Sequence, residues 1–245
     1  MSKKVLCSRV VVAYAILSAS VFSMGVPYEK SGFYTGLSAG IGYNASNFNG
    51  EGTRLNGLMG AMDLRSHRGR ISTCGFEKDL DGFVGYMMHL PRRDWMAGIE
   101  FGFEKPFYKK HFDNALWGEV MGIPIPGVYK CRVKTLYVAK LHAKIGKILN
   151  GEWFVYSLAG VDMKKIETFM EEGPVGKINA KKCIFGLAIG LGAEREISTN
   201  WHLGLELVNT YYPSKTFGVD NLHFRGNEKV KANTTQVALR LIYSF

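Results

Sequence analysis

The last twelve residues, TTQVALRLIYSF from Thr234 to Phe245, alternate between two kinds of side chain. One set, at every second position, is apolar or aromatic throughout: Val237, Leu239, Leu241, Tyr243 and Phe245. The residues between them include small and polar side chains, and one of these is Arg240. Because successive side chains of a strand point to opposite faces, this period of two predicts a β-strand with one apolar face.

The same alternation recurs along the chain. Five further segments show it clearly: 33–43, 95–103, 137–145, 185–193 and 201–207. Two more, 82–90 and 153–163, are apolar on both faces and alternate poorly, but their composition also favours strands. Together with the last segment, the sequence predicts eight strands.

The links between these strands alternate in length. Short links fall at 91–94, 147–152 and 195–200, and long links fall at 44–80, 105–132, 164–182 and 212–233. Such alternation is typical of barrels in outer membranes. The sequence therefore predicts an all-β fold, an eight-stranded antiparallel up-and-down transmembrane β-barrel with short periplasmic turns and long extracellular loops.

The two faces of the strands distinguish this fold from a soluble all-β secreted domain, which is the alternative. Glycine, glutamate and lysine share one face, as expected for the lumen of a narrow barrel where small residues relieve crowding. The other face is apolar, with Trp95, Trp201, Tyr43, Tyr243 and Phe245 near strand ends. This arrangement favours a lipid-facing band edged by aromatic residues.

The amino terminus has the pattern of an export signal. Lys3, Lys4 and Arg9 precede a mostly apolar run, followed by small residues. Residues 1–23 are therefore expected to be a signal peptide, cleaved within 20–25, and 24–245 to be the barrel domain. A membrane anchor is the alternative, but the run is shorter than the roughly 20 residues that span a bilayer. Losing three basic residues lowers the net charge from +10 to +7.

The opening GFYTGLSAGIGY, Gly32 to Tyr43, and the ending QVALRLIYSF, Gln236 to Phe245, resemble the first and last strands of small outer-membrane β-barrel proteins. This group includes the OmpA transmembrane domain and opacity-type bacterial surface antigens. In such families a terminal Phe after alternating apolar residues is the signal that the barrel-insertion machinery reads. The resemblance implies the same role for Val237, Leu239, Leu241, Tyr243 and Phe245.

Four ionisable residues fall on the expected inner face at matching steps from their strand ends: Glu100, Lys140, Glu206 and Arg240. Buried charges are costly unless paired. We therefore expect a charge layer in which Glu100 pairs with Lys140 and Glu206 pairs with Arg240. This layer would plug the lumen, and a gate that opens to ions is the alternative.

The four long links carry 19 Lys and Arg against 11 Asp and Glu, counted over 45–79, 105–132, 164–182 and 212–233. Clusters such as Arg65, Arg68 and Arg70, or Lys181 and Lys182, could attract lipopolysaccharide or polyanions of a host surface, although a plain solvated surface also explains them. No nucleic-acid motif accompanies these charges. The expected protein is a monomeric surface antigen or adhesin-like protein in the outer membrane, without a cofactor; a small passive channel is the alternative.

An outer-membrane enzyme is a further alternative that the sequence disfavours. His142 and His202 are expected to face inward, and Ser38 and Ser157 are present, but no pair suggests a nucleophile beside a base. The glycines of GLAIGLGAE, Gly186 to Glu194, fit strand packing better than a nucleotide loop. Of three cysteines in the mature chain, Cys74 could form a disulfide with Cys131 or Cys183, or all three could stay reduced.

Overall fold

The computed structural model describes residues 31–54, 65–91, 94–107, 109–120, 123–150, 152–172, 176–221 and 224–245. Side chains are described for 31–46, 74–91, 94–107, 134–150, 152–167, 181–216, 229 and 231–245. The predicted signal peptide, residues 1–23, lies outside the described residues. These ranges contain no helix with the length and apolarity needed to cross a membrane.

The described chain is almost entirely strand. Its elements are β1 (Gly32–Arg54), β2 (Arg65–His89), β3 (Trp95–Pro106), β4 (Lys109–Val120), β5 (Ile123–Leu149), β6 (Trp153–Glu172), β7 (Gly176–Ser198), β8 (Trp201–Asn221) and β9 (Phe224–Ser244). Each strand pairs antiparallel with its neighbours.

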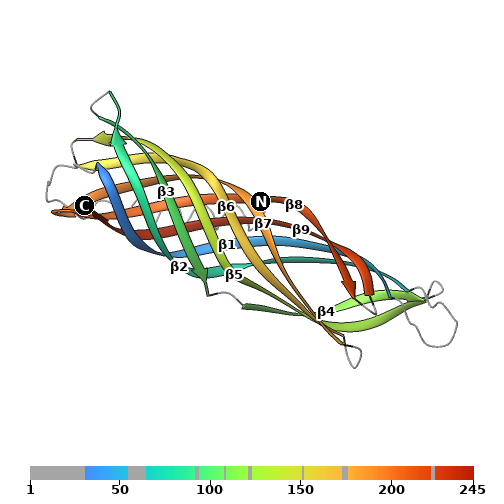
Figure 1. Cartoon of the computed structure of the whole chain (residues 1–245). Coiled ribbons are helices and arrows are strands. Elements are labelled where there is room, and N and C mark those ends of the chain that lie inside the picture. The colour runs from blue at the N-terminus through green and yellow to red at the C-terminus, as the bar shows by residue number, and fades with distance from the viewer. Residues whose placement is uncertain are drawn as a thin grey trace, which may run out of the picture.

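The sheet closes into a ring with eight strand positions. Its order is β1-β9-β8-β7-β6-β5-β3-β2, and β2 returns to β1. β4 occupies the same position as β3, because both pair with β5 on one side and with β2 on the other. The predicted eight-stranded antiparallel barrel is therefore confirmed. Figure 1 shows the strands winding around one cylinder, with the C-terminus at one end and β4 at the other.

The prediction of four long loops is wrong in extent. Most residues of the expected loops continue the strands, so that β1 and β2 stay paired as far as Arg54 and Arg65. Likewise β8 and β9 stay paired as far as Asn221 and Phe224. The pattern of apolar residues stops because lipid no longer covers the outer face there, whereas the backbone pairing does not depend on that pattern. A hydrophobic period therefore locates the membrane band, not the ends of the strands.

The two faces are arranged as predicted. On β1, Phe33, Leu37 and Ile41 point outward and are exposed, whereas Tyr34 and Ser38 point inward and are buried. The other strands repeat this arrangement, with Ile99, Leu141, Leu187 and Leu239 among the outward apolar residues. An apolar outer surface of this size cannot face water in a stable protein, so it indicates a lipid-facing band.

An apolar core fills the periplasmic end of the lumen, a feature that the alternation did not predict. It consists of Tyr34, Phe83, Met87, Met96, Phe154, Tyr156, Leu158, Ala188, Val208 and Ile242. The two poorly alternating segments, 82–90 and 153–163, supply five of these residues, which explains why both of their faces are apolar. Glycines on adjacent strands make room: a Cβ at Gly85 would collide with the Tyr34 ring, and one at Gly192 with the Tyr156 ring.

Candidate functional site

Five charged side chains meet in the lumen next to the apolar core. Arg240 donates from Nη1 to Glu206 Oε2 at 2.6 Å and from Nη2 to Glu100 Oε2 at 2.5 Å. Lys144 Nζ lies 2.8 Å from the same Glu100 oxygen and 3.2 Å from Glu206 Oε2. Glu194 Oε1 lies 3.9 Å from both Lys144 Nζ and Arg240 Nε. We call these five residues the inner cluster.

Two tyrosines of the apolar core join this cluster. Tyr34 donates its hydroxyl to Glu100 at 2.9 Å, and Tyr156 donates to Glu206 at 2.7 Å. The Arg240 guanidinium also stacks on Phe83, 3.9 Å from the ring centroid. The core and the cluster therefore form one continuous packing unit, in which each tyrosine has an apolar body and a bonded hydroxyl.

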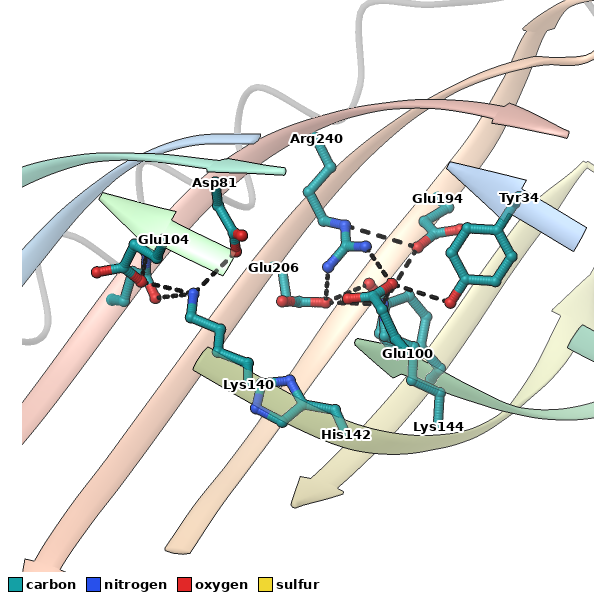
Figure 2. A network of polar contacts seen from close by, with 12 residues as sticks. Tyr34, Asp81, Glu100, Glu104, Lys140, His142, Lys144, Glu194, Glu206 and Arg240 are labelled. Atoms are coloured by element: carbon teal, nitrogen blue, oxygen red, sulfur yellow. Dashed lines mark hydrogen bonds and ion pairs between the residues drawn. The ribbon is translucent and has the colours of Figure 1, made fainter. Parts of the chain in front are cut away.

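A second group of charges lies further toward the extracellular end. Lys140 Nζ bridges Asp81 at 2.9 Å and Glu104 at 2.6 Å, and it also donates to Gln236 at 3.3 Å. We call these four residues the outer cluster. Figure 2 shows the two clusters side by side, with Lys140 turned toward Asp81 and Glu104 and Arg240 turned toward Glu206, Glu100 and Glu194.

His142 belongs to a smaller network. Its Nε2 lies 2.8 Å from Asp162 Oδ1, and Thr210 donates to the other Asp162 oxygen at 2.7 Å. All three side chains are buried. The aspartate contacts both the histidine and the hydroxyl, so His142 and Thr210 are not paired as base and nucleophile.

Burial and pairing decide what this arrangement can do. Arg240 and Lys144 are each only 2% exposed, and Glu100 is 5% exposed. Charges this far from bulk water persist only with partners of opposite charge, and each of the five residues of the inner cluster has one within 4.0 Å. The clusters join strands around the ring and fill the lumen with bonded groups. Among the described residues, no set of three or more His, Cys, Asp or Glu is placed to hold a metal ion.

One of the two expected ion pairs forms and the other does not. Glu206 contacts Arg240, but Glu100 contacts Lys144 and Arg240 instead of Lys140. The register explains the difference, since Glu100 lies opposite His142 and Lys140 lies opposite Gly102. Barrel strands are tilted and staggered, so residues at equal steps from their strand ends need not share one height. The expected single layer is therefore two clusters.

Sequence reasoning missed five members of these clusters: Asp81, Glu104, Lys144, Glu194 and Gln236. Lys144 and Glu104 have the inward parity of their strands, so the period of two could have found them. Asp81 was out of reach because it falls between the expected loop, 44–80, and the expected strand, 82–90, so neither face was assigned to it. Glu194 is the last residue of GLAIGLGAE, a segment that was interpreted only through the packing of its glycines.

One of the inward histidines contacts a serine that the sequence analysis did not consider. Ser244 Oγ lies 3.0 Å from His202 Nε2. The two residues are 7% and 1% exposed at the periplasmic end of the lumen. The contact satisfies two buried polar groups.

The residues of the expected insertion signal lie on the outer face of β9. Leu239, Leu241 and Phe245 are exposed, and Tyr243 stacks edge-on against Trp201 and Phe245. Their role in insertion stays a prediction. No disulfide joins Cys74 to Cys183, whereas the side chain of Cys131 lies outside the described part of the chain, so a disulfide between Cys74 and Cys131 stays a prediction.

No protein-family model and no curated protein matches this sequence. Solved structures do resemble it. The outer-membrane protease OmpT of Escherichia coli aligns with a TM-score of 0.51 and 8% identity, over 90% of this chain and 99% of that one. The fold is that of an outer-membrane β-barrel. At this identity the likeness concerns the fold alone.

Two smaller barrels align with lower scores. The attachment invasion locus protein Ail of Yersinia pestis, solved with the heparin analogue sucrose octasulfate, has a TM-score of 0.40 and 14% identity over 87% of this chain and 99% of that one. Neisserial surface protein A has a TM-score of 0.37 and 14% identity over 89% of this chain and 100% of that one. The closed ring and the apolar outer band establish the barrel independently of these scores.

Proposed function

We propose that this outer-membrane β-barrel is a surface antigen or adhesin-like protein, which interacts with polyanions through the basic segments beyond the membrane band. The observation that carries this proposal is the packing of the lumen, where the apolar core and the inner cluster place packed and paired side chains. We infer that these side chains leave no route for solutes through the barrel. The function is then expected to lie in the parts of the barrel outside the membrane.

The extracellular extensions have the charge for such a role. The four segments predicted as long loops together contain 19 basic and 11 acidic residues. Lys181 and Lys215 are exposed side chains in this part of the barrel. A field of one sign attracts anionic surfaces such as lipopolysaccharide or sulfated polysaccharides of a host cell. The side chains of Arg65, Arg68 and Arg70 lie outside the described part of the chain.

A binding measurement tests the proposal. The protein would be placed in nanodiscs of phosphatidylcholine, and its affinity for heparin and for purified lipopolysaccharide would be measured at physiological salt. We expect the triple variant Arg65→Gln, Arg68→Gln, Arg70→Gln to bind roughly tenfold more weakly, because it removes three charges from one extension.

The matched control removes three basic residues at the opposite end: Arg92→Gln, Arg93→Gln and Lys147→Gln. We expect it to bind like the wild type. Equal loss in both variants, or no loss in the first, would contradict the proposal. Single-channel recording of the wild type addresses the alternative of a passive channel, and a steady current of porin size would favour that alternative.

A further inference from the structure

Asp79 is a buried carboxyl group of the lumen that has no cation beside it. The residue is 6% exposed, and its Oδ1 has no hydrogen-bond partner. The outer cluster is its neighbour, but Lys140 of that cluster is paired with Asp81 at 2.9 Å and with Glu104 at 2.6 Å (Figure 2). Among the side chains that the structure describes, none places a positive charge within 4.0 Å of Asp79. Asp79 differs in this respect from the carboxylates of the inner cluster.

The neighbouring strand makes room for this carboxyl group. Asp79 lies directly opposite Gly40 of β1, and a Cβ at Gly40 would collide with Asp79 Oδ1. At Gly42, the next inward position of β1, a Cβ would lie 3.9 Å from Asp79 Oδ2 and 3.7 Å from the Thr234 side chain. Because a larger residue at Gly40 would displace the carboxyl group, the glycine defines the place that Asp79 occupies.

The groups around Asp79 carry an excess of negative charge. β1 and β9 face it with uncharged residues, namely Gly40, Gly42, Thr234 and Gln236. The titratable side chains of this part of the lumen are Glu77 and Asp81 on β2, Glu104 on β3, Lys140 and His142 on β5, Asp162 and Lys164 on β6, Lys182 on β7 and Tyr212 on β8. With His142 neutral, this set has four carboxylates against three lysines even without Asp79. An ionised Asp79 would add to that excess.

Burial decides which cation can neutralise Asp79. A metal ion needs several ligands around it, and in the described ranges no three His, Cys, Asp or Glu side chains are placed to supply them. A proton needs no space beyond its bond to oxygen, and it converts the carboxylate into a neutral group. Removal from water and nearby negative charges both favour the neutral form of a carboxyl group. The chemistry of the site therefore favours a proton.

We propose that Asp79 is a proton-binding site of the barrel, which keeps its proton at neutral pH for as long as the protein is folded. Loss of that proton places an unpaired charge between β1 and β3, so the barrel becomes less stable as the pH rises. This goes beyond the proposed function, because the site lies inside the barrel and needs no ligand at the cell surface.

Unfolding at several pH values tests the proposal. An aspartate of the unfolded chain is ionised at neutral pH, so folding would take up a proton at Asp79, and a lower pH then favours the folded state. The variant Asp79→Asn is neutral at every pH and nearly matches the shape of a protonated aspartate. In urea unfolding of the mature chain in lipid vesicles, we expect this variant to be more stable than the wild type.

The size of that gain should depend on pH. Between about pH 5 and pH 8 the ratio of the two unfolding equilibrium constants should grow by roughly tenfold per pH unit, while the folded wild type keeps its proton. An infrared spectrum reports the proton itself, since a protonated carboxyl group has a C=O stretching band that a carboxylate lacks. We expect part of this band to be present in the wild type at neutral pH and absent from Asp79→Asn.

Glu100→Gln is the matched control. Glu100 is 5% exposed, and the change again replaces a carboxyl group by its amide, but Glu100 has Arg240 and Lys144 as partners. We expect this variant to be less stable than the wild type throughout the same pH range, and to leave the band of the protonated carboxyl group unchanged. The two amide variants should therefore shift the stability in opposite directions.

Three results would overturn the proposal. The first is an Asp79→Asn variant that is less stable than the wild type at about pH 8, which is the result for an ionised aspartate with a partner. The second is a difference between the two proteins that does not change with pH. The third is an infrared band that survives in Asp79→Asn but is lost in Glu104→Gln, since the proton would then belong to Glu104.

Heat-modifiable migration on gels would show that every variant is folded before it is compared. The measurements involve no polysaccharide and no lipopolysaccharide, so the proton site and the proposed surface function can fail separately.

Discussion

Arg240 connects strands that do not neighbour one another. From β9 it reaches Glu206 on the adjacent β8 and Glu100 on β3, which lies across the lumen. The contact with Glu206 follows from antiparallel neighbours and could be predicted from the sequence. The contact with Glu100 depends on barrel stagger and diameter, which the period of two does not contain. The predicted partner of Glu100 was wrong for that reason.

Replacing Arg240 should destabilise the barrel strongly. In Arg240→Met, two buried glutamates lose their closest cation and share Lys144 alone, so we expect the free energy of unfolding to fall by about 3–5 kcal/mol. Urea unfolding in lipid vesicles, followed by tryptophan fluorescence, would measure it. Adding Glu206→Leu to this variant should recover part of the loss, since one uncompensated charge is removed with its partner.

Lys147→Met is the control for that prediction. Lys147 is exposed and lies 4.0 Å from Asp94, so its removal should change the free energy of unfolding by less than about 0.5 kcal/mol. A loss of similar size in both variants would show that the lumen pairs are not what stabilises the barrel.

At the scale of the strand, glycine position matters more than glycine number. A Cβ on Gly192 of β7 would meet the buried Tyr156 ring, whereas one on Gly82 of β2 would meet only Leu37 at 3.8 Å. The sequence predicted that inward glycines relieve crowding. It could not say which large side chain uses the space, because Tyr156 was read as part of a strand apolar on both faces.

Gly192→Ala should therefore cost about 1–3 kcal/mol of unfolding free energy, because the Tyr156 ring must move and weaken its bond to Glu206. Gly82→Ala, with space for its methyl group, should stay within about 0.5 kcal/mol of the wild type. Both can be compared by the same urea unfolding measurement. Equal losses would mean that backbone effects, not the tyrosine ring, set the cost.

At the scale of the whole molecule, the sequence specified strand number, direction and faces, because each follows from local alternation and link length. It placed the strand ends wrongly, since the water-exposed extensions pair through the backbone without a hydrophobic period. It also placed the inward charges in one layer where the structure has two clusters. Local patterns in the sequence were therefore enough to predict the ring of strands. The height of each residue within the barrel depends on how the strands are staggered, which local patterns do not contain.

Delivery of the whole barrel to the membrane should depend on its last residue. Phe245→Asp should lower the amount of heat-modifiable protein in the outer membrane several-fold, because it removes the aromatic end of the predicted insertion signal. Phe33→Asp is a matched control: Phe33 is also outward, 69% exposed against 76% for Phe245, and its carbonyl accepts the Phe245 amide at 3.1 Å. Both changes put a carboxylate at nearly the same place in the bilayer interface.

Both variants carry the cost of placing a carboxylate at the interface. A difference between them in the amount of assembled barrel therefore measures the contribution of the insertion signal. Assembly reduced only in Phe245→Asp would support a terminal signal. Assembly reduced equally in both, or in neither, would contradict it.

The pairing of β1 with β9 also sets an order of events in time. Tyr34 pairs with Ser244, so the seam of the ring joins the two extremes of the described chain. While the protein is being made and exported, its first strand has no final neighbour on that side until the last strand has been synthesised. Contacts this distant in sequence form slowly. For that whole interval the open edge of β1 would be exposed to pairing with other chains, so the unfinished barrel is the state most prone to aggregation.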